Sequence, residues 1–585
     1  MKRTEYPDPQ FERKNWICLN GMWEFEIDNS KTGFERGLLH KPLSQRIEVP
    51  FCPESVLSGI GYTDFIYACW YRKYFHLTQN QIQDRIILRF GAVDYAAKIY
   101  INGQYVCGHN GGYTPFAADI TKYVNAGKNE VVVYVEDDIT ANVPSGKQSF
   151  KESHGCFYTR VTGIWQSVWI EFTPEHYLKS VKYFPNVKNG TVDVETIVQG
   201  HENLTVRIFY CGKLMGEESV ICSYKKRVTV FLKEKYLWEP GKGELYDVEI
   251  TFGKDKVYSY FGLREVACKD GMVIINGNPF FQKLVLDQGY YPDGIYTAKD
   301  SSEFVRDIKI STDLGFNGAR LHQKVFEPRF LYECDKAGYV VWGEMPSWGI
   351  HCFNLEPLGN FISEWGEVIE RDFNHPCIIA WCPLNEMWED YQNKELICDI
   401  RFSRIVYNFT KEVDPTRPSV DASGGYHSER TDIFDVHCYQ DASKMQACLN
   451  AVEKGEMIFG KVFAPNDPDG KYAGQFICIS EYGGRTFSRV KNLQVSTAGE
   501  VAHLENTTGW GYVALDGEET FVNDFIALTD MLFDCSKVCG FCYTQLYDVE
   551  QEQNGFYTYE RNPKISEISV NKILKCMRRD KLWTK

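Results

Sequence analysis

Hydrophobic and polar positions alternate along the first 178 residues, in short runs separated by turn signals. The runs RIILRF, AAKIYINGQYV, NEVVVYVEDD and SVWIEF show the alternation that half-buried strands produce. Asn102-Gly103 stands between strand-like runs and is typical of a tight hairpin. Because no helical pattern interrupts these runs, residues 1–178 are predicted to form a jelly-roll β-sandwich.

Residues 179–266 continue the strand pattern on a smaller scale. The runs are VKYFPNV, TVDVETIVQ, LTVRIFYCG, RVTVFL and LYDVEITF. Their number and spacing predict a second β-sandwich of immunoglobulin-like type.

After Gly262 the pattern changes, and apolar runs alternate with segments of helical spacing. FISEWGEVIERDF, for example, places Phe361, Ile362, Trp365, Val368 and Ile369 on one helical face. Eight candidate strands follow one another: FFQKLVLD, FNGARLH, GYVVWGEM, CIIAWCPLNE, PSVDAS, IFDVHCYQ, QFICISEYG and GFCYTQL. Eight strand–helix alternations predict a (β/α)₈ barrel over residues 267–585.

The composition narrows the range of partners. The chain has 585 residues, enough for several cores, and a net charge of −15 without any Lys/Arg-rich block. This balance argues against nucleic acids and anionic membranes as partners. Aromatic residues make up 15% of the chain, and those that are not core could serve as stacking platforms for sugar rings.

The N-terminus and the cysteines predict a cytoplasmic location. MKRTEYPDPQFERKNW lacks the apolar segment of a signal peptide, and no apolar run is long enough to cross a bilayer. Many of the 20 cysteines lie inside apolar runs, as small buried hydrophobes do in a reducing compartment. Cys535, Cys539 and Cys542 have zinc-like spacing, but VCGFCYTQL reads as a strand and no second ligand pair lies nearby, so no metal is expected there.

Polar and ionisable residues collect where the predicted barrel strands end. Chemistry in such barrels takes place at the carboxyl ends of the strands. Read in order, these ends carry Asp287 and Gln288, Arg320 and His322, Glu344, Asn385 and Glu386, Asp421, His437 and Tyr439, Glu481 and Tyr482, and Gln545. The fold would bring these side chains to one mouth.

Two carboxylates in this set can face each other across the barrel axis. Glu386 ends the fourth strand and Glu481 the seventh. Retaining glycoside hydrolysis needs an acid/base and a nucleophile about 5–5.5 Å apart. Asn385 could bind a sugar 2-hydroxyl, and Tyr439 could donate to Glu481. Since two close carboxylates cannot both ionise easily, Glu386 is expected to keep its proton and Glu481 its charge.

Each of these residues also has a structural interpretation. A glutamate at a strand end is often a solvated loop charge or a helix cap. Arg320 could hold a carboxylate in a structural ion pair, and Tyr439 could belong to the core. The spacing alone leaves both interpretations open.

Longer motifs resemble glycoside hydrolase family 2, which contains β-galactosidases, β-glucuronidases and β-mannosidases. In the N-terminal part these are LNGMWEF, VPFCPESVLSGIG, WYRKYF and TGIWQSVWIEF, and at the junction with the barrel FGLREV and INGNPFF. RDFNHPCIIAWCPLNE is similar to the family's acid/base signature, ICISEYGG to its nucleophile strand, and GFNGARLH and CDKAGYVVWGE to its second and third barrel strands. The resemblance implies that Glu386 is the acid/base and Glu481 the nucleophile, supported by Asn385, Arg320 and Tyr439.

Departures from the family pattern bear on metal and substrate. The region after the third strand reads MPSWGIH and lacks the Glu-x-His pair of the large β-galactosidases, so neither a magnesium site nor any cofactor is expected. LDQGYYPDG follows the first strand, which makes Asp287 and Gln288 candidates for binding sugar hydroxyls. LHQKVFEP places His322 and Lys324 near the mouth.

No lysine or arginine is clearly marked by the sequence as the group that would bind the carboxylate of an acidic sugar. Asn562-Pro563-Lys564 matches the Asn-x-Lys string of β-glucuronidases, but by register that position falls on residues 552–554, which carry no cation. Lys324 or Arg485 could bind a uronate carboxylate, or could make ordinary ion pairs within the protein. Trp388 and Tyr543 are candidate stacking walls, or core.

The sequence therefore predicts a retaining exo-β-glycosidase that acts on a carbohydrate. A β-galactoside and a β-uronide (galacturonide or glucuronide) remain open as substrates, with β-mannosidase or β-glucosidase specificity as the alternative. A non-catalytic carbohydrate-binding protein and a metal-dependent hydrolase on the same barrel are the rival functions. The resemblance also allows a homo-oligomer, and the first sandwich could lend a loop to the pocket.

Overall fold

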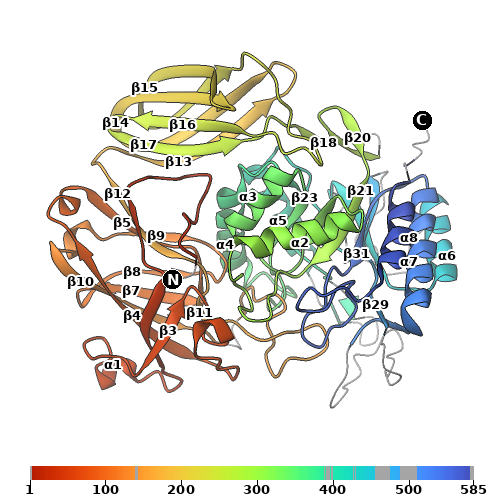
Figure 1. Ribbon diagram of the computed structural model, residues 1–585, viewed down its shortest axis with the longest axis horizontal. Coiled ribbons are helices and arrows are strands. Elements are labelled where there is room, and N and C mark those ends of the chain that lie inside the picture. The colour runs from red at the N-terminus through yellow and green to blue at the C-terminus, as the bar shows by residue number, and fades with distance from the viewer. Residues whose placement is uncertain are drawn as a thin grey trace.

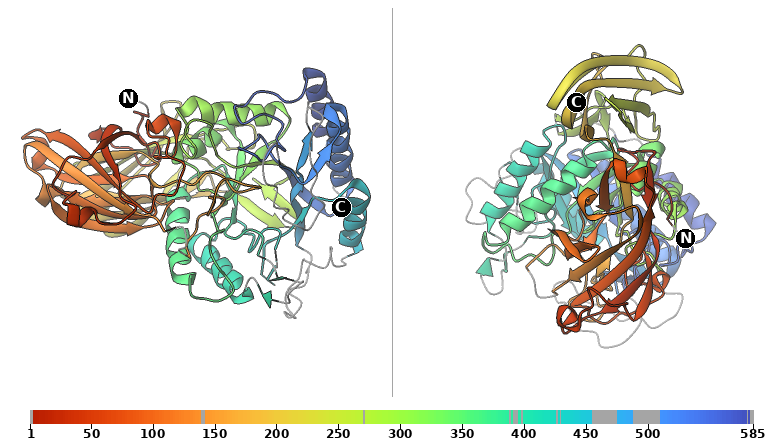
Figure 2. Two further views of the ribbon diagram at one scale, coloured as in Figure 1. Left: turned by 90° about the horizontal axis from the view of Figure 1, so that it is seen from below. Right: turned by 90° about the vertical axis from the view of Figure 1, so that its left-hand side faces the viewer.

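The chain folds into two β-sandwiches packed against a barrel of parallel strands. The computed structural model describes residues 3–138, 142–269, 271–387, 389–390, 395–396, 399–425, 427–428, 430–454, 475–487, 510–579 and 581. In Figure 1 the first sandwich lies at the left in red and orange, the second at the top in yellow, and the barrel at the right in green and blue. The right-hand view of Figure 2 looks past the first sandwich toward the barrel, with the second sandwich at the top.

The first sandwich is built from antiparallel sheets. Its strands are β1 (Trp16–Cys18), β2 (Gly21–Ile27), β3 (Gln45–Val49), β4 (Ala68–Leu77), β5 (Arg85–Phe90), β6 (Val93–Asp94), β7 (Ala96–Ile101), β8 (Gln104–Asn110), β9 (Phe116–Asp119), β10 (Gly127–Glu136), β11 (Gly163–Ile164) and β12 (Val168–Thr173), with a short helix α1 (Gly33–Arg36). The sheets have the orders β1-β12-β5-β9 and β3-β2-β4-β10-β7-β8. Asn102 and Gly103 turn between β7 and β8, both with positive φ, as a tight hairpin requires.

The second sandwich is dominated by two long strands. It contains β13 (Tyr177–Asn186), β14 (Thr191–Tyr210), β15 (Lys213–Phe231), β16 (Tyr246–Phe252) and β17 (Asp255–Phe261). β14 pairs with β13 along its first half and with β16 along its second half, while β15 follows its other edge. Alternate apolar residues of these strands form a separate core.

The barrel begins after a small antiparallel sheet of β18 (Val266–Lys269), β19 (Met272–Ile275) and β20 (Asn278–Phe280). Its strands are β21 (Gln282–Asp287), β22 (Gly318–Leu321), β23 (Val340–Glu344), β24 (Ile378–Cys382), β27 (Ile433–Cys438), β28 (Phe476–Gly483) and β31 (Val538–Thr544), in the parallel order β24-β23-β22-β21-β31-β28-β27. Its helices are α2 (Ser301–Asp313), α3 (Pro328–Ala337), α4 (Leu358–Asp372), α5 (Ile400–Val413), α6 (Ala442–Lys454), α7 (Gly517–Asp534) and α8 (Glu567–Met577). Two short pairs complete the described strands: β25 (Glu389–Asp390) with β26 (Glu395–Leu396), and β29 (Arg485–Phe487) with β30 (Val513–Leu515).

The predicted fifth strand is not a regular strand. Its segment, residues 418–423, touches the fourth only through isolated parallel bridges at Ser419 and Ser423. The Asp421 N–H donates to Thr431 Oγ1, and the Ala422 N–H donates to Asp421 Oδ1. Because these backbone N–H groups donate to side chains, they cannot pair with the neighbouring strand. The segment therefore occupies the fifth position of the barrel without forming a regular strand.

Local signals explain where the barrel helices begin and end. Asp300 caps α2 by accepting from the Ser302 N–H at 2.9 Å. α3 starts on Pro328, whose missing N–H would have no helical partner, and ends at Gly338 with φ of 65°. Among the described residues, no helix combines the length and apolar character that crossing a bilayer requires.

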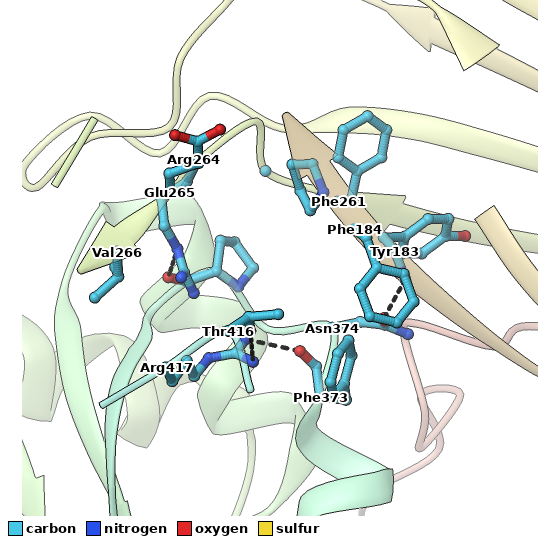
Figure 3. Close-up of a pocket in the computed structure, with 13 residues that line it drawn as sticks. Tyr183, Phe184, Phe261, Arg264, Glu265, Val266, Phe373, Asn374, Thr416 and Arg417 are labelled. Carbon is cyan, nitrogen blue, oxygen red and sulfur yellow. Dashed lines mark hydrogen bonds between the residues drawn. The ribbon is translucent and has the colours of Figure 1, made fainter. Parts of the chain in front are cut away.

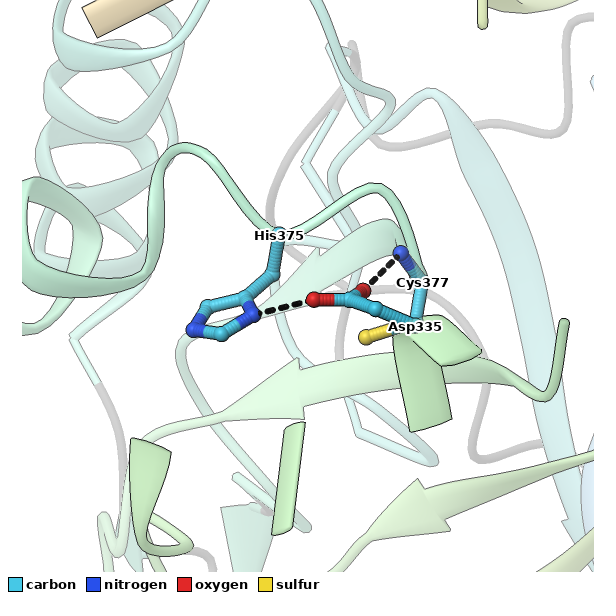
Figure 4. A group of neighbouring side chains, drawn as sticks. All are labelled: Asp335, His375 and Cys377. Atoms are coloured by element: carbon cyan, nitrogen blue, oxygen red, sulfur yellow. Dashed lines mark hydrogen bonds and ion pairs between the residues drawn. The ribbon is translucent and has the colours of Figure 1, made fainter. Parts of the chain in front are cut away.

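A buried aspartate joins the second sandwich to the barrel. Asp335, on α3, accepts from Tyr260 OH at 2.8 Å and from His375 Nδ1 at 2.6 Å through one oxygen, and from the Cys377 N–H at 2.9 Å through the other. Figure 4 shows Asp335, His375 and Cys377. Because its carboxylate oxygens accept from donors of both the second sandwich and the barrel, Asp335 forms a structural junction with Tyr260, His375 and Cys377.

A pocket of about 120 Å³ also lies at this junction (Figure 3). Arg264 and Arg417 line it, and both guanidinium groups donate to backbone carbonyls, sharing that of Ile378. Its lining shares no residue with the site described below. The two arginines therefore serve the domain contact.

The first sandwich reaches the barrel through residues 142–162. The Ser145 N–H donates to the Trp348 carbonyl at 2.8 Å. On the other side, Gln551 Nε2 donates to the carbonyls of Gly155 at 2.8 Å and Phe157 at 2.9 Å. This segment is thus fastened to the loops that follow β23 and β31, at the carboxyl ends of the strands.

Candidate active site

The structure brings Glu386 and Glu481 together. Glu386 follows β24, and Glu481 lies near the end of β28. A carboxylate oxygen of each, and a ring nitrogen of His437, all lie within 4.8 Å of one another. The two acidic side chains therefore share one site, although 95 positions separate them in the sequence.

Glu386 has a strained backbone. Its φ is 51°, a left-handed conformation that costs a non-glycine residue roughly 1–3 kcal/mol. Its N–H donates to the Ser423 carbonyl at 2.7 Å, and its Oε1 accepts from His437 Nδ1 at 2.9 Å. These contacts hold the turn that ends the apolar run of β24, and the side chain stays 17% exposed.

Glu481 is buried and surrounded by donors. Arg320 Nη1 donates to its Oε1 at 2.8 Å, and the Tyr439 hydroxyl donates to its Oε2. Burial by itself raises the pKa of this carboxyl, but the positive charges of His437 and Arg320 outweigh burial and lower it to about 2. Glu481 is therefore ionised at neutral pH.

Arg320 connects three groups of the site. Besides Glu481, it donates from Nε to Glu344 at 2.6 Å and from Nη2 to Asn385 Oδ1 at 2.6 Å. Burial raises the pKa of Glu344 on its own, yet Arg320 and His322 lower it to about 2. Arg320 thus makes a structural ion pair with Glu344 and also positions Glu481 and Asn385.

Asn385 is oriented with its amide nitrogen free. Its oxygen accepts from Arg320, which identifies the other end of the amide as Nδ2. Nδ2 is buried and has no hydrogen-bond partner among the described residues. This donor is available to an acceptor on a bound molecule.

His437 bridges the two carboxylates, a role that sequence reasoning did not give it. Nδ1 lies 2.9 Å from Glu386 Oε1 and 3.4 Å from Glu481 Oε2. Burial alone lowers the pKa of His437, but Glu481 and Glu386 raise it above its ordinary value. The position of His437 at a predicted strand end was the feature of the sequence that could have indicated this role.

Tyr439 is held flat against a second tyrosine. Its hydroxyl lies 3.1 Å from Thr544 Oγ1 and donates to Glu481. Its ring stacks on Tyr512 with centroids 3.5 Å apart and an interplanar angle of 6°. Sequence reasoning missed Tyr512, because it lies before α7 and not at a strand end.

Lys324 and Arg485 do not reach the carboxylate pair. Lys324 Nζ donates to the carbonyls of Gly289 and, at 2.8 Å, Tyr296, and burial lowers its pKa to about 7. Arg485 donates from Nε to Asp524 at 2.7 Å and to nearby backbone carbonyls. Both cations have protein partners, which favours the structural interpretation of the two that the sequence left open.

Asp287 and Gln288 lie at the end of β21, and protein hydrogen bonds use part of the polar atoms of their side chains. Asp287 Oδ1 accepts from Tyr547 OH and, at 2.9 Å, from the Gly289 N–H, while burial raises the pKa of Asp287 to about 6. Gln288 Nε2 donates to Gln545 Oε1 at 3.0 Å, and Gln288 Oε1 has no partner among the described residues. Gln288 therefore keeps a buried acceptor for another group.

His322, Tyr543 and Trp388 are the remaining predicted positions. His322 Nδ1 lies 3.0 Å from Glu344 Oε1 and 3.9 Å from Glu481 Oε1, and burial lowers the pKa of His322 below its ordinary value. Tyr543 is fully buried among Tyr482, Phe525 and Phe556, which makes it core and not a stacking wall. Trp388 lies outside the described residues.

Two accidental motifs have structural explanations. Lys564 Nζ donates to Asp548 Oδ1 at 2.8 Å, so the Asn562-Pro563-Lys564 string ends in an ion pair. Cys539 and Cys542 lie on β31 and are buried in the barrel core.

We expect a buried histidine behind the site to make stability depend on pH. His427 Nδ1 lies 2.7 Å from Asp421 and Nε2 3.1 Å from Asp435, and Asp435 in turn accepts from Ser423 and Ser480. Burial lowers the pKa of His427, but Asp421 and Asp435 raise it well above its ordinary value. Its contribution is therefore full below about pH 6.5 and is lost progressively as the pH rises toward the folded-state value.

His427→Gln should lower the free energy of unfolding by about 3–5 kcal/mol in this acid range, because it leaves buried carboxylates unpaired. Asp435 sets the acid limit of this stabilisation. Burial by itself raises the pKa of Asp435, but His427 outweighs burial and lowers it to about 2. The contribution of Asp435 to stability is therefore lost as the pH falls from about 4 toward 2. Thermal melting of both proteins from pH 4 to pH 10 measures the difference. A difference that stays constant above pH 6.5 would contradict the raised pKa.

A parallel barrel with two close carboxylates at its strand ends, one clamped by an arginine and a tyrosine, defines a carboxylate-dependent hydrolase. Residues 63–174 match the model of the glycosyl hydrolases family 2 sugar binding domain, and residues 266–497 match that of the family 2 TIM barrel domain. The chain belongs to glycoside hydrolase family 2. It is a β-glycosidase, and its substrate is a carbohydrate.

Individual relatives agree with this assignment. The chain is 28% identical over 447 residues to a beta-glucuronidase of Rattus norvegicus, covering 68% of this chain and 67% of that protein. It is also 28% identical over 408 residues to a beta-galactosidase of Thermoanaerobacter pseudethanolicus, covering 65% and 51%.

Solved structures agree in fold. A beta-glucuronidase from an uncultured Clostridium sp. superposes with a TM-score of 0.77 at 22% identity, covering 97% of this chain and 99% of that chain. A beta-D-glucuronidase from Dictyoglomus thermophilum gives 0.76 at 22% identity, covering 99% and 100%. The predicted family, fold class and enzyme class are thus confirmed.

Proposed function

We propose that the protein is a retaining exo-β-glycosidase in which Glu386 is the acid/base and Glu481 the nucleophile. The separation of the two carboxylates carries this proposal. Their oxygens approach within 4.8 Å, near the spacing of about 5–5.5 Å in retaining enzymes and well below the 6.5–9.5 Å or so that leaves room for water in inverting ones.

The charges support this division of roles. Glu481 is ionised, fixed by Arg320 and Tyr439, and so supplies a carboxylate in a defined orientation. Glu386 is more exposed and contacts His437, which is suited to a group that must exchange protons with the leaving group and with water.

The reaction follows in two steps. Glu481 attacks the anomeric carbon while Glu386 gives its proton to the departing oxygen, which breaks the glycosidic bond and forms a glycosyl ester. Glu386 then removes a proton from water, whose oxygen attacks the same carbon and releases Glu481. Asn385 Nδ2 would bind the 2-hydroxyl, a contact that strengthens in the transition state.

The sandwich segment 142–162 supports exo action. It is fastened to loops at the carboxyl ends of the barrel strands, where it would close the site to the interior of a long chain. The sugar would be a β-galactoside or a β-uronide, and relatives named for both activities match the chain.

A panel of nitrophenyl β-galactoside, β-glucoside, β-mannoside, β-glucuronide and β-galacturonide tests the proposal. Release of nitrophenol from at least one of them is expected. Proton NMR of the first product should show the β anomer, because two inversions restore the configuration. Initial formation of the α anomer would rule out the retaining mechanism.

A further inference from the structure

A lysine of the first sandwich and a glutamate of the barrel form a buried pair beside the reactive carboxylates. Lys147 belongs to segment 142–162, and Glu552 lies after β31. Their side chains are 5% and 1% exposed. Lys147 Nζ and Glu552 Oε2 are 4.0 Å apart, which is too far for a direct hydrogen bond.

The ammonium of Lys147 has unused donors. Among the described residues no hydrogen bond from Nζ is found, the rings of Trp348 and Tyr158 lie 5.3 Å and 5.8 Å from it, and the Cys156 thiol is also nearby. An ammonium carries three donors, and a buried cation without acceptors is costly. Lys324, by contrast, donates to two carbonyls.

Glu552 is held in place but keeps accepting capacity. Its Oε2 accepts from Tyr158 OH, and its Oε1 accepts from Asn554 Nδ2 at 3.1 Å. Each carboxylate oxygen can accept a second bond. Asn554 Oδ1 is buried and has no partner in the described chain.

Contacts on one side connect Lys147 to the reactive site. The ring of Trp348 lies beneath Lys147, and its Nε1 lies 3.3 Å from the Asn385 carbonyl, to which it donates. Burial lowers the pKa of Lys147, but Glu552 raises it, and Glu481 and Glu386 are close enough to add to this effect.

Contacts on the other side connect Glu552 to Glu481. The Trp510 N–H donates to the Gln551 carbonyl, beside Glu552, and its ring packs edge-on against Tyr512 at 4.9 Å. Tyr512 stacks on Tyr439, which donates to Glu481. The two series of contacts meet at the pair, so Lys147 and Glu552 border the same site as the carboxylates.

We propose that Lys147 and Glu552 together bind one hydroxyl group of the terminal sugar and select neutral β-glycosides over β-uronides. A hydroxyl oxygen about 2.8 Å from both atoms fits between groups 4.0 Å apart, accepting from Lys147 and donating to Glu552. The inference rests on the proposed glycosidase function and names its substrate class.

The charges around the site disfavour a uronate. The cations Lys147, Arg320 and His437 are matched by the carboxylates Glu552, Glu344 and Glu481. A sugar carboxylate at this pair would lie beside Glu552, and two buried carboxylates so close cannot both remain ionised. A hydroxyl satisfies both groups and adds no charge.

Matched substrates test the selectivity of the natural enzyme. We expect kcat/KM for the nitrophenyl β-galactoside or β-glucoside to exceed that for the corresponding uronide by at least about 100-fold. Faster hydrolysis of either uronide would overturn this inference and leave the glycosidase function standing. Hydrolysis of none of the five panel substrates would instead refute the proposed function.

Variants test the two residues. Lys147→Met and Glu552→Gln should each lower kcat/KM on the best neutral substrate by about 10- to 100-fold, because a hydrogen bond to a charged group is lost. On the deoxy analogue lacking the bound hydroxyl, the same substitutions should have little further effect. Glu552→Gln should also reduce the discrimination against the matching uronide.

Two exposed residues provide controls. Lys151→Met, in the same segment, and Glu560→Gln, a short distance after Glu552, should keep natural rates. Circular dichroism and melting curves verify folding. Losses of equal size on the parent and on every deoxy analogue would show that the pair is only structural and would overturn the proposal.

Discussion

Glu481→Gln is expected to reduce kcat/KM on the best aryl β-glycoside by at least about 10⁴-fold. The amide has nearly the shape of the carboxylate, but it cannot form the glycosyl ester. Steady-state release of nitrophenol at high enzyme concentration measures the residual rate. Because Arg320 would lose one of its carboxylate partners, circular dichroism must show that the fold is intact.

Glu344→Gln separates loss of the nucleophile from loss of charge. Glu344 accepts from the same guanidinium at 2.6 Å but is not one of the proposed reacting groups. This variant should lose clearly less activity than Glu481→Gln. Equal losses would indicate that Glu481 acts by holding Arg320, and a near-natural rate in Glu481→Gln would refute the nucleophile assignment.

Glu386→Gln should produce a loss that depends on the leaving group. With a poor leaving group, the first step needs a proton, and kcat/KM should fall by about 10²–10⁴-fold. With a dinitrophenyl glycoside, the leaving group departs without protonation, so the first step should remain close to normal. Deglycosylation still lacks its base, and the glycosyl ester on Glu481 should accumulate.

Two measurements follow this intermediate. Rapid mixing should show a burst of dinitrophenol equal to the enzyme concentration, and intact-protein mass should rise by one glycosyl residue. Glu560→Gln, on the surface, is the matched control and should show neither effect. A loss of the same size for good and poor leaving groups would contradict the acid/base role of Glu386.

The architecture could be predicted from local pattern. Alternating residues in β7 bury one face of a sheet, whereas the apolar runs of β24 and β28 are buried on both faces. These patterns depend on the order of residues within each element. The fifth barrel segment was wrong as a strand because side chains of its own neighbourhood take its backbone donors.

The proposed catalytic pair could be located for a related reason. Parallel strands bring their carboxyl ends to one edge, so an acidic residue that ends an apolar run lies near others that do the same. Glu386 and Glu481 both satisfy this rule, and the structure brings them within 4.8 Å. This rule can be applied to the sequence alone, because it does not depend on which side chains make contact across the barrel.

The sequence by itself thus determined the fold class and the family, and it located the two carboxylates proposed to react, since each depends on local order or on a long contiguous motif. Only the tertiary structure decided which cation faces the site. Lys324 and Arg485 lie close in sequence to strand ends, yet both donate to other protein groups. Lys147 comes from another domain and reaches the mouth because segment 142–162 is fastened there. A charged residue in a sequence does not show its partner, because that partner can come from a distant part of the chain.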